Sequence, residues 1–326
     1  ALRQTWAIPA VAMDANEDFY LVLPSGYHPG GVDTGGSAIF LRAHDGQVIR
    51  QLPITNLSAA WVSNYLAADA SFWQKNAKRF QPDNYANQGV LGDLHGQVWT
   101  LNGPSWSLTK LAGYTDNTGR GAPLYFSTAV ATWPMKTNPD FSIYASLSGN
   151  FYEKSPYLNP PVSWLNNPNQ FHRSALYLRA EPLTGGSPCS RTLVFSSLQR
   201  PNQPGTFLSL RTQPTSYPLL LIPTLDANNQ NALALVTVYD PDALTCIGAT
   251  YLIIQPFNPA TCTLGTPVVV FGGGGVSSGF VIAPEAVLFA KSFVGEGGQA
   301  SLQVLPISPP REGSEGSGVT WWREIQ

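Results

Sequence analysis

Apolar residues along this chain come in short runs, mostly of four to eight, which are rich in β-branched and aromatic side chains and end at Gly, Pro, Asn or Asp. Runs of this kind are typical of β-strands. Strands are predicted over residues 19–23, 38–41, 96–101, 141–147, 193–195, 219–222, 232–238, 250–254, 267–271 and 301–305. Helical periodicity is nearly absent, and a short helix is predicted only at Trp61–Ala68 or Ala70–Phe80. The pattern therefore predicts an all-β fold.

A weakly conserved unit recurs along the chain: a small residue and Pro, an apolar pair, a polar turn, and then further strands. It is found in residues 8–52, 87–102, 123–155, 217–261 and 265–308. A four-stranded propeller blade needs about 45 residues, so 326 residues correspond to about seven blades. We predict a single β-propeller domain over residues 1–326, with loop insertions. A pair of β-sandwiches is the alternative, although it would not need the repeat.

Charged residues are scarce, and this argues against some classes of function. Asp, Glu, Lys and Arg make up 12% of the residues, against roughly 25% in an average protein. The net charge of -2 leaves no basic field for a phosphate backbone, which argues against nucleic-acid binding. No stretch is long and apolar enough to span a membrane. Few Lys and many Asn, Gln, Ser and Thr are typical of a secreted surface, which predicts an extracellular protein.

The most specific motif is GDLHGQVWTLN at residues 92–102. It resembles the G-D-L-x-G-x-V-W-R-x-(D/N) strand pair of the PilY1-like, or PilC-like, type IV pilus tip-associated proteins, with Thr100 in place of the usual Arg. Three further segments resemble the family in the same order: LRAHDGQVIRQL at 41–52, SIYASLSGNFYEKS at 142–155 and GVTWWREI at 318–325. The resemblance covers nearly the whole chain and implies the C-terminal β-propeller domain of such a protein.

The resemblance also implies a function and a location. The chain is then a fragment of a longer secreted precursor, placed at the pilus tip or in association with the outer membrane. It is a non-enzymatic adhesin domain that supports pilus assembly, extension and retraction, twitching motility and surface attachment. The implied partners are minor pilins, host or abiotic surfaces, and glycans. The alternative is an extracellular lectin-like or quinoprotein-like propeller unrelated to pili, although the adjacent-cysteine disulfide of the quinone-dependent enzymes is missing.

Calcium is the one cofactor that the sequence raises. The family places a calcium loop of the form D-x-(D/N)-x-(D/N) ahead of its G-D-L motif, and its ligand positions fall here on Arg79, Gln81, Asp83, Tyr85 and Asn87. Arg79 places a positive charge where a carboxylate is needed, so we expect this site to be lost or weakened. Residues Asp14, Asn16 and Asp18 fit the alternate-oxygen spacing better, and an Asx turn explains them equally well.

No catalytic residue is assigned, because the four histidines form no paired spacing and no nucleophile motif occurs. Aromatic residues in loops are candidates for partner binding, namely Trp133, Tyr157 and Trp164, with core packing as the alternative. Tyr157 and Trp164 lie in a Pro- and Asn-rich insertion at 152–173, which is the predicted partner-binding loop. Cys246 and Cys262 flank a predicted strand, and a local disulfide between them is a possible pairing; unpaired thiols are the alternative.

Overall fold

The protein is described by a computed structural model. The described residues are 7–306 without 15, 17, 27–35, 74–87, 104, 134–139, 151–156, 168, 223–230, 245–246, 277–279, 284–285 and 293–299. They form strands, turns and two 3-10 helices, η1 (Val162–Trp164) and η2 (Phe195–Ser197). No helix among them is long and apolar enough to cross a membrane.

The predicted short helix is wrong in the part that the structure describes. Residues 61–68 are irregular, and Ser71–Trp73 forms a strand. The carbonyls that would close helical turns serve other partners instead: Tyr65 O accepts a hydrogen bond from Leu94 N, and Leu66 O accepts one from Gly26 N. Hydrogen bonds to the turn that contains Leu94 and to Gly26, which follows the end of a strand, therefore replace the local helical ones.

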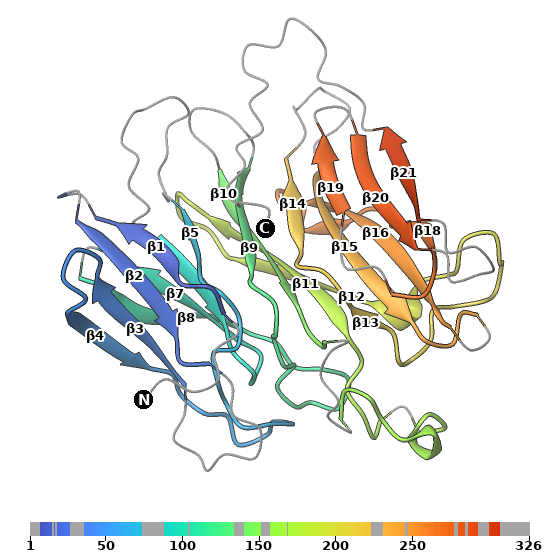
Figure 1. The fold of residues 1–326 in the computed structure, drawn as a ribbon, viewed down its shortest axis with the longest axis horizontal. Coiled ribbons are helices and arrows are strands. Elements are labelled where there is room, and N and C mark those ends of the chain that lie inside the picture. The colour runs from blue at the N-terminus through green and yellow to red at the C-terminus, as the bar shows by residue number, and fades with distance from the viewer. Residues whose placement is uncertain are drawn as a thin grey trace, which may run out of the picture.

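Five antiparallel sheets follow one another along the described chain (Figure 1). The first contains β1 (Ala10–Met13), β2 (Phe19–Pro24), β3 (Ser37–Arg42) and β4 (Val48–Pro53). The second contains β5 (Ser71–Trp73), β6 (Gln88–Gly92), β7 (Gln97–Asn102) and β8 (Ser107–Gly113). The third contains β9 (Ala129–Trp133), β10 (Phe141–Leu147), β11 (Ala175–Pro182) and β12 (Cys189–Val194).

The fourth sheet has two long central strands, and each of them pairs along its outer side with two separate strands. It contains β13 (Gln213–Pro214), β14 (Leu219–Leu221), β15 (Ala232–Asp240), β16 (Ala249–Asn258), β17 (Thr263–Leu264) and β18 (Val268–Gly274). Both β13 and β14 pair with β15, and both β17 and β18 pair with β16, so six strands fill four positions. The fifth sheet contains β19 (Phe280–Ala283), β20 (Ala286–Ser292) and β21 (Ala300–Pro306).

The sheets are arranged as blades around a common axis. Strand β1 lies beside β5, β5 beside β9, and β9 beside β14, so the first four sheets meet in turn through strands at their inner edges, while the fourth and fifth sheets meet through β18 and β20. This arrangement is that of a β-propeller. Each of the ten predicted strand segments lies at least partly in an observed strand, which confirms the all-β prediction. The described residues form five sheets, and the predicted count of about seven blades is not confirmed.

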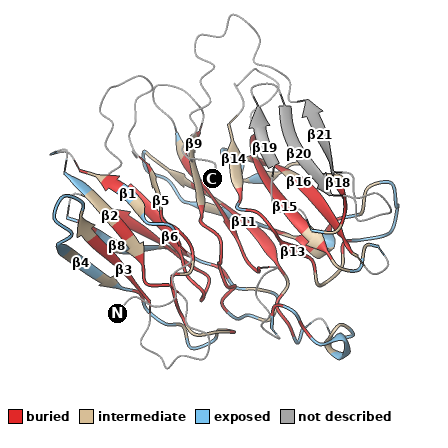
Figure 2. Ribbon diagram, in the orientation of Figure 1, coloured by how far each residue is buried: buried red, intermediate tan, exposed pale blue. Residues whose placement is uncertain are grey.

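Burial explains why many strands read as continuous apolar runs rather than as alternating ones. Six of the seven residues of β10 are buried, and seven of the ten residues of β16, because the faces of these strands are covered by neighbouring sheets (Figure 2). The largest apolar cluster joins the third and fourth sheets. By contrast, no residue of the edge strand β4 is fully buried.

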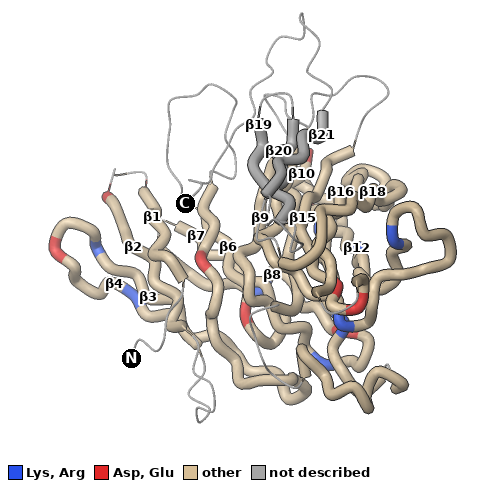
Figure 3. The backbone as a smooth tube through the Cα atoms, turned by 45° about the vertical axis from the view of Figure 1, so that its right-hand side comes forward, with Lys and Arg blue, Asp and Glu red and all other residues tan. Residues whose placement is uncertain are grey.

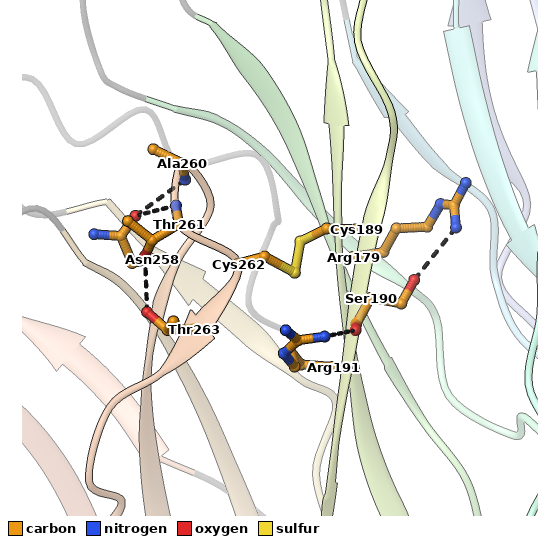
Figure 4. The surroundings of a disulfide bond; sticks show 9 residues. All are labelled: Arg179, Cys189, Ser190, Arg191, Asn258, Ala260, Thr261, Cys262 and Thr263. Carbon is orange, nitrogen blue, oxygen red and sulfur yellow. Dashed lines mark hydrogen bonds between the residues drawn. A yellow bond between two sulfur atoms is a disulfide. The ribbon is translucent and has the colours of Figure 1, made fainter.

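A disulfide crosses between the third and fourth sheets (Figure 4). It joins Cys189, at the start of β12, to Cys262, which precedes β17, with their Cα atoms 6.0 Å apart. The predicted pairing of Cys262 with Cys246 is therefore wrong. The sulfur of Cys262 forms one disulfide, and its partner is Cys189.

We expect the double substitution Cys189→Ala and Cys262→Ala to destabilise the domain. The cross-link joins residues 73 positions apart, and the chain-entropy model predicts a loss of about 4 kcal/mol in the free energy of unfolding. Guanidinium denaturation without reductant measures this loss. Non-reducing peptide mapping checks the pairing itself, and a peptide that joins Cys262 to Cys246 would contradict the structure.

Candidate functional site

The GDLHGQVW motif forms the hairpin between β6 and β7, and its aspartate is the centre of a hydrogen-bond network. Asp93 is fully buried. Its Oδ1 accepts hydrogen bonds from the backbone N–H groups of His95 at 3.0 Å and Gln97 at 2.8 Å. Its Oδ2 accepts from Trp99 Nε1 at 2.8 Å, Gln97 Nε2 at 2.9 Å and Asn64 Nδ2 at 3.1 Å. The carboxylate thus holds the turn, the following strand and a distant segment together.

Burial and hydrogen bonding act on this carboxyl group in opposite directions. Burial raises the pKa of Asp93, and the hydrogen bonds from Trp99, Gln97 and Asn64 oppose that rise. Gly96 completes the turn at φ +76°, where a Cβ atom would lie 2.3 Å from the carbonyl oxygen of Tyr114. Only glycine fits here, both for its conformation and for the close approach of the neighbouring backbone.

His95 fastens the same hairpin to the segment ahead of β5. Its Nδ1 accepts a hydrogen bond from Leu57 N at 2.8 Å, and its Nε2 lies 2.8 Å from the carbonyl oxygen of Val62. These two partners require the neutral ring with the proton on Nε2. Asp93 and His95 therefore have their polar atoms committed to partners within the domain, and the motif acts as a structural centre.

A second turn repeats the geometry of the first. In each, Gly stands three residues after Asp, and the Asp carboxylate accepts from the backbone at the second and fourth following residues. Asp116 Oδ1 accepts from Thr118 N at 2.8 Å and Arg120 N at 3.3 Å. Its Oδ2 accepts from Trp61 Nε1 and lies 2.9 Å from Nδ1 of His172. The shared D-x-x-G spacing was the sequence signal for this site, which the sequence analysis missed.

The pKa of Asp116, which is paired with the buried His172, is shifted in the opposite direction to that of Asp93. Both side chains are fully shielded from solvent. Burial opposes ionisation of Asp116, but hydrogen bonds from His172, Thr118 and Trp61 outweigh it and hold the pKa of this carboxyl below its usual value. Asp116 is therefore an ionised acceptor at neutral pH.

The candidate calcium residues of the first hairpin form an Asx turn. Asp14 Oδ1 accepts from Asn16 N at 2.9 Å and Asp18 N at 3.1 Å, and Oδ2 accepts from the hydroxyl of Tyr20 at 3.1 Å. These hydrogen bonds complete the turn without an ion. Within the described residues, no group of three or more His, Cys, Asp or Glu side chains is placed to hold a metal. Calcium binding at Asp14 stays a prediction.

The family calcium loop lies outside the described residues. This applies to Asp83, Tyr85 and Asn87, as it does to Cys246. The calcium-loop prediction therefore has no structural counterpart here, whereas the pairing of Cys246 with Cys262 is excluded by the bond from Cys262 to Cys189.

The predicted binding aromatics fall into two groups. Trp133 is 5% exposed and packs against Phe141 in the core, so its prediction as a binding residue is wrong. Tyr157 and Trp164 do come together, with ring centroids 6.5 Å apart. Tyr157 also packs on Trp61, at 4.9 Å between centroids. The structure thus brings the two loop aromatics onto a third ring from another part of the chain.

The loop that carries these aromatics is tied to the turn of Asp116. Asn117 Nδ2 donates to the carbonyl oxygen of Phe171 at 3.3 Å, and Arg173 N donates to Asn117 Oδ1 at 3.2 Å. His172 lies between these two residues and meets Asp116. The second sheet therefore holds the end of a loop that belongs to the third sheet.

The whole fold resembles a solved structure. The C-terminal domain of PilY1 from Pseudomonas aeruginosa superposes with a TM-score of 0.56, over 95% of this chain and 73% of that one. The chain has the fold of the PilY1 C-terminal domain. Sequence identity is 13%, so the likeness concerns the fold. No protein-family model and no curated protein matches the sequence.

The likeness to the PilY1 domain agrees with the resemblance that the G-D-L motif carries. The motif residues that match the family pattern include Asp93, Gly96 and Trp99. In the structure these residues are the acceptor, the close-packed turn and a buried donor of one network. These three positions of the motif therefore have structural roles in this fold.

We predict that Asp93→Asn lowers the free energy of unfolding by about 3 kcal/mol, since its amide would face donors that lose their acceptor. Urea denaturation measures this. The matched control is Asp45→Asn, in the exposed hairpin between β3 and β4, where Oδ1 accepts from Gln47 N. Its effect should be much smaller, and equal losses in the two variants would argue against the central role of Asp93.

We predict that the stabilisation by Asp116 depends on pH. Its pKa is lower in the folded chain, so the ionised carboxylate stabilises the fold above the ordinary aspartate pKa of about 3.9, and this stabilisation disappears as the pH falls through the folded-state value. Asp116→Asn should therefore be less stable than the wild type at pH 7, with a gap that narrows by pH 3. Urea denaturation at both pH values tests this; a constant gap would refute it.

Proposed function

We propose that this chain is a non-enzymatic binding domain of a type IV pilus system that works outside the cell. In this role it supports pilus assembly, extension and retraction, and through them twitching motility and attachment to surfaces. Its partners are minor pilins at the pilus tip, together with host or abiotic surfaces and their glycans.

The observation that carries the proposal is the likeness to the PilY1 C-terminal domain over 95% of the chain. The family-like motif at residues 92–102 supports it as well, because the motif is a feature of the sequence and does not depend on the fold comparison. Fold alone does not fix a function. The combination of the two makes the pilus role the best supported one.

The distribution of charge supports a role in binding rather than catalysis. Charged residues are sparse and scattered along the chain (Figure 3). Three buried acids, Asp93, Asp116 and Asp240, are hydrogen-bonded to their own surroundings. Asp240, for example, accepts from the guanidinium of Arg200 at 2.9 Å and from Ser209 N at 3.1 Å. Carboxylates used in this way stabilise the scaffold.

An in-frame deletion of the coding sequence in the source organism tests the proposal. We expect fewer surface pili by electron microscopy, smaller twitching zones and weaker attachment, all restored by the wild-type sequence. A deletion strain with normal piliation, motility and attachment would overturn the proposed function.

A further inference from the structure

The long connection between β10 and β11 presents an exposed aromatic surface. We use the name aromatic loop for residues 157–167 and 169–173 of this connection. It contains η1, which is the yellow-green coil at the lower right of Figure 1, away from the sheets. Val162 is 72% exposed and Tyr157 37% exposed, and both are among the exposed large apolar residues of the described chain. Exposed apolar side chains on a loop away from the sheets are candidates for contact with a partner.

The aromatic side chains of this loop form a row that continues onto the body of the domain. Trp164 packs on Tyr157, and Tyr157 packs on Trp61. The guanidinium of Arg120 then lies over Trp61, 4.4 Å from the ring centroid. The row thus begins at a half-buried loop tryptophan and ends at an exposed cation.

The loop is held in place before any partner arrives. Asp116 fixes Trp61 and His172, and Asn117 bonds to the backbone on both sides of His172. Pro160 and Pro161 restrict the backbone ahead of η1. A preorganised surface loses less conformational entropy on binding, which favours affinity.

The charged side chains in and beside the aromatic loop are basic, apart from the shielded Asp116. Residues 157–173 contain no Asp, Glu or Lys. Arg120 is exposed, Arg173 is half-buried, and within the described residues neither forms a salt bridge. The nearby acid Asp116 is fully shielded and hydrogen-bonded. The centres of protein interfaces are likewise enriched in Trp, Tyr and Arg and depleted of Lys, Asp and Glu.

We propose that the aromatic loop, together with Arg120, is the docking surface for a protein partner that presents carboxylates beside an apolar patch; the buried ring of Trp61 contacts both Tyr157 and Arg120 and supports them. Val162, Tyr157 and Trp164 supply the apolar contact, and Arg120 pairs with the carboxylates of the partner. The inference rests on the proposed function, in which the domain binds protein components of the pilus.

The test measures binding of each purified minor pilin of the same pilus to the full chain, by calorimetry at low and high salt. We expect Trp164→Ala to weaken binding by about tenfold or more, and Val162→Ser to weaken it severalfold. Arg120→Ala should weaken binding and flatten its salt dependence, because rim charges act through screened attraction. The matched control is Val268→Ser, an exposed valine on β18, which should bind as the wild type does.

The outcomes separate this inference from the proposed function. If no minor pilin binds the wild type, the proposed pilin partnership fails and the inference fails with it. If the wild type binds but the Val162 and Trp164 variants bind equally well, the docking surface is wrong while the proposed function stands. Val162→Ser decides the case if Trp164→Ala fails to fold, as judged by thermal unfolding. Loss of glycan-array binding in the variants, with pilin binding intact, would overturn the protein-partner assignment.

Discussion

The fully buried carboxylate of Asp93 is the interaction on which the second sheet depends. Burying an ionised carboxylate costs several kcal/mol unless hydrogen bonds replace its water. Here five donors do so, two from the backbone and three from side chains. One of these donors, Asn64, comes from the segment ahead of β5, so the cost of burial is offset only when that segment and the hairpin are both in place. The network therefore couples local turn formation to tertiary assembly.

The same use of aspartate recurs in other turns of the chain. Asp14, Asp116 and Asp240 each accept a hydrogen bond from the backbone N–H two residues later, as Asp93 does. A carboxylate in this position satisfies backbone donors that a tight turn leaves unpaired. Four of the twenty acids of the chain are used in this way. At these positions the carboxylate stabilises the turn itself.

Sequence patterns predicted the features that depend on neighbouring residues, and missed those that depend on tertiary contacts. The strand over 141–147 matches β10 residue for residue, because buried β-strands are rich in apolar residues and end at turn residues. The pairing of Cys262 failed because a disulfide depends on which blades are adjacent. Trp133 was misplaced because an aromatic at a strand end looks the same in sequence whether it faces solvent or the core. No helix forms at 61–68, because the carbonyls of Tyr65 and Leu66 accept hydrogen bonds from Leu94 and Gly26, which are distant in sequence.

The aromatic loop shows how one segment can join the scaffold and the surface. It is a connection within the third sheet, yet its end is fastened to a turn that follows the second. The disulfide in turn fastens the third sheet to the fourth. Three consecutive blades are therefore linked by specific bonds in addition to apolar packing. A partner that docks on the loop would therefore contact a segment that is fixed to two of these blades.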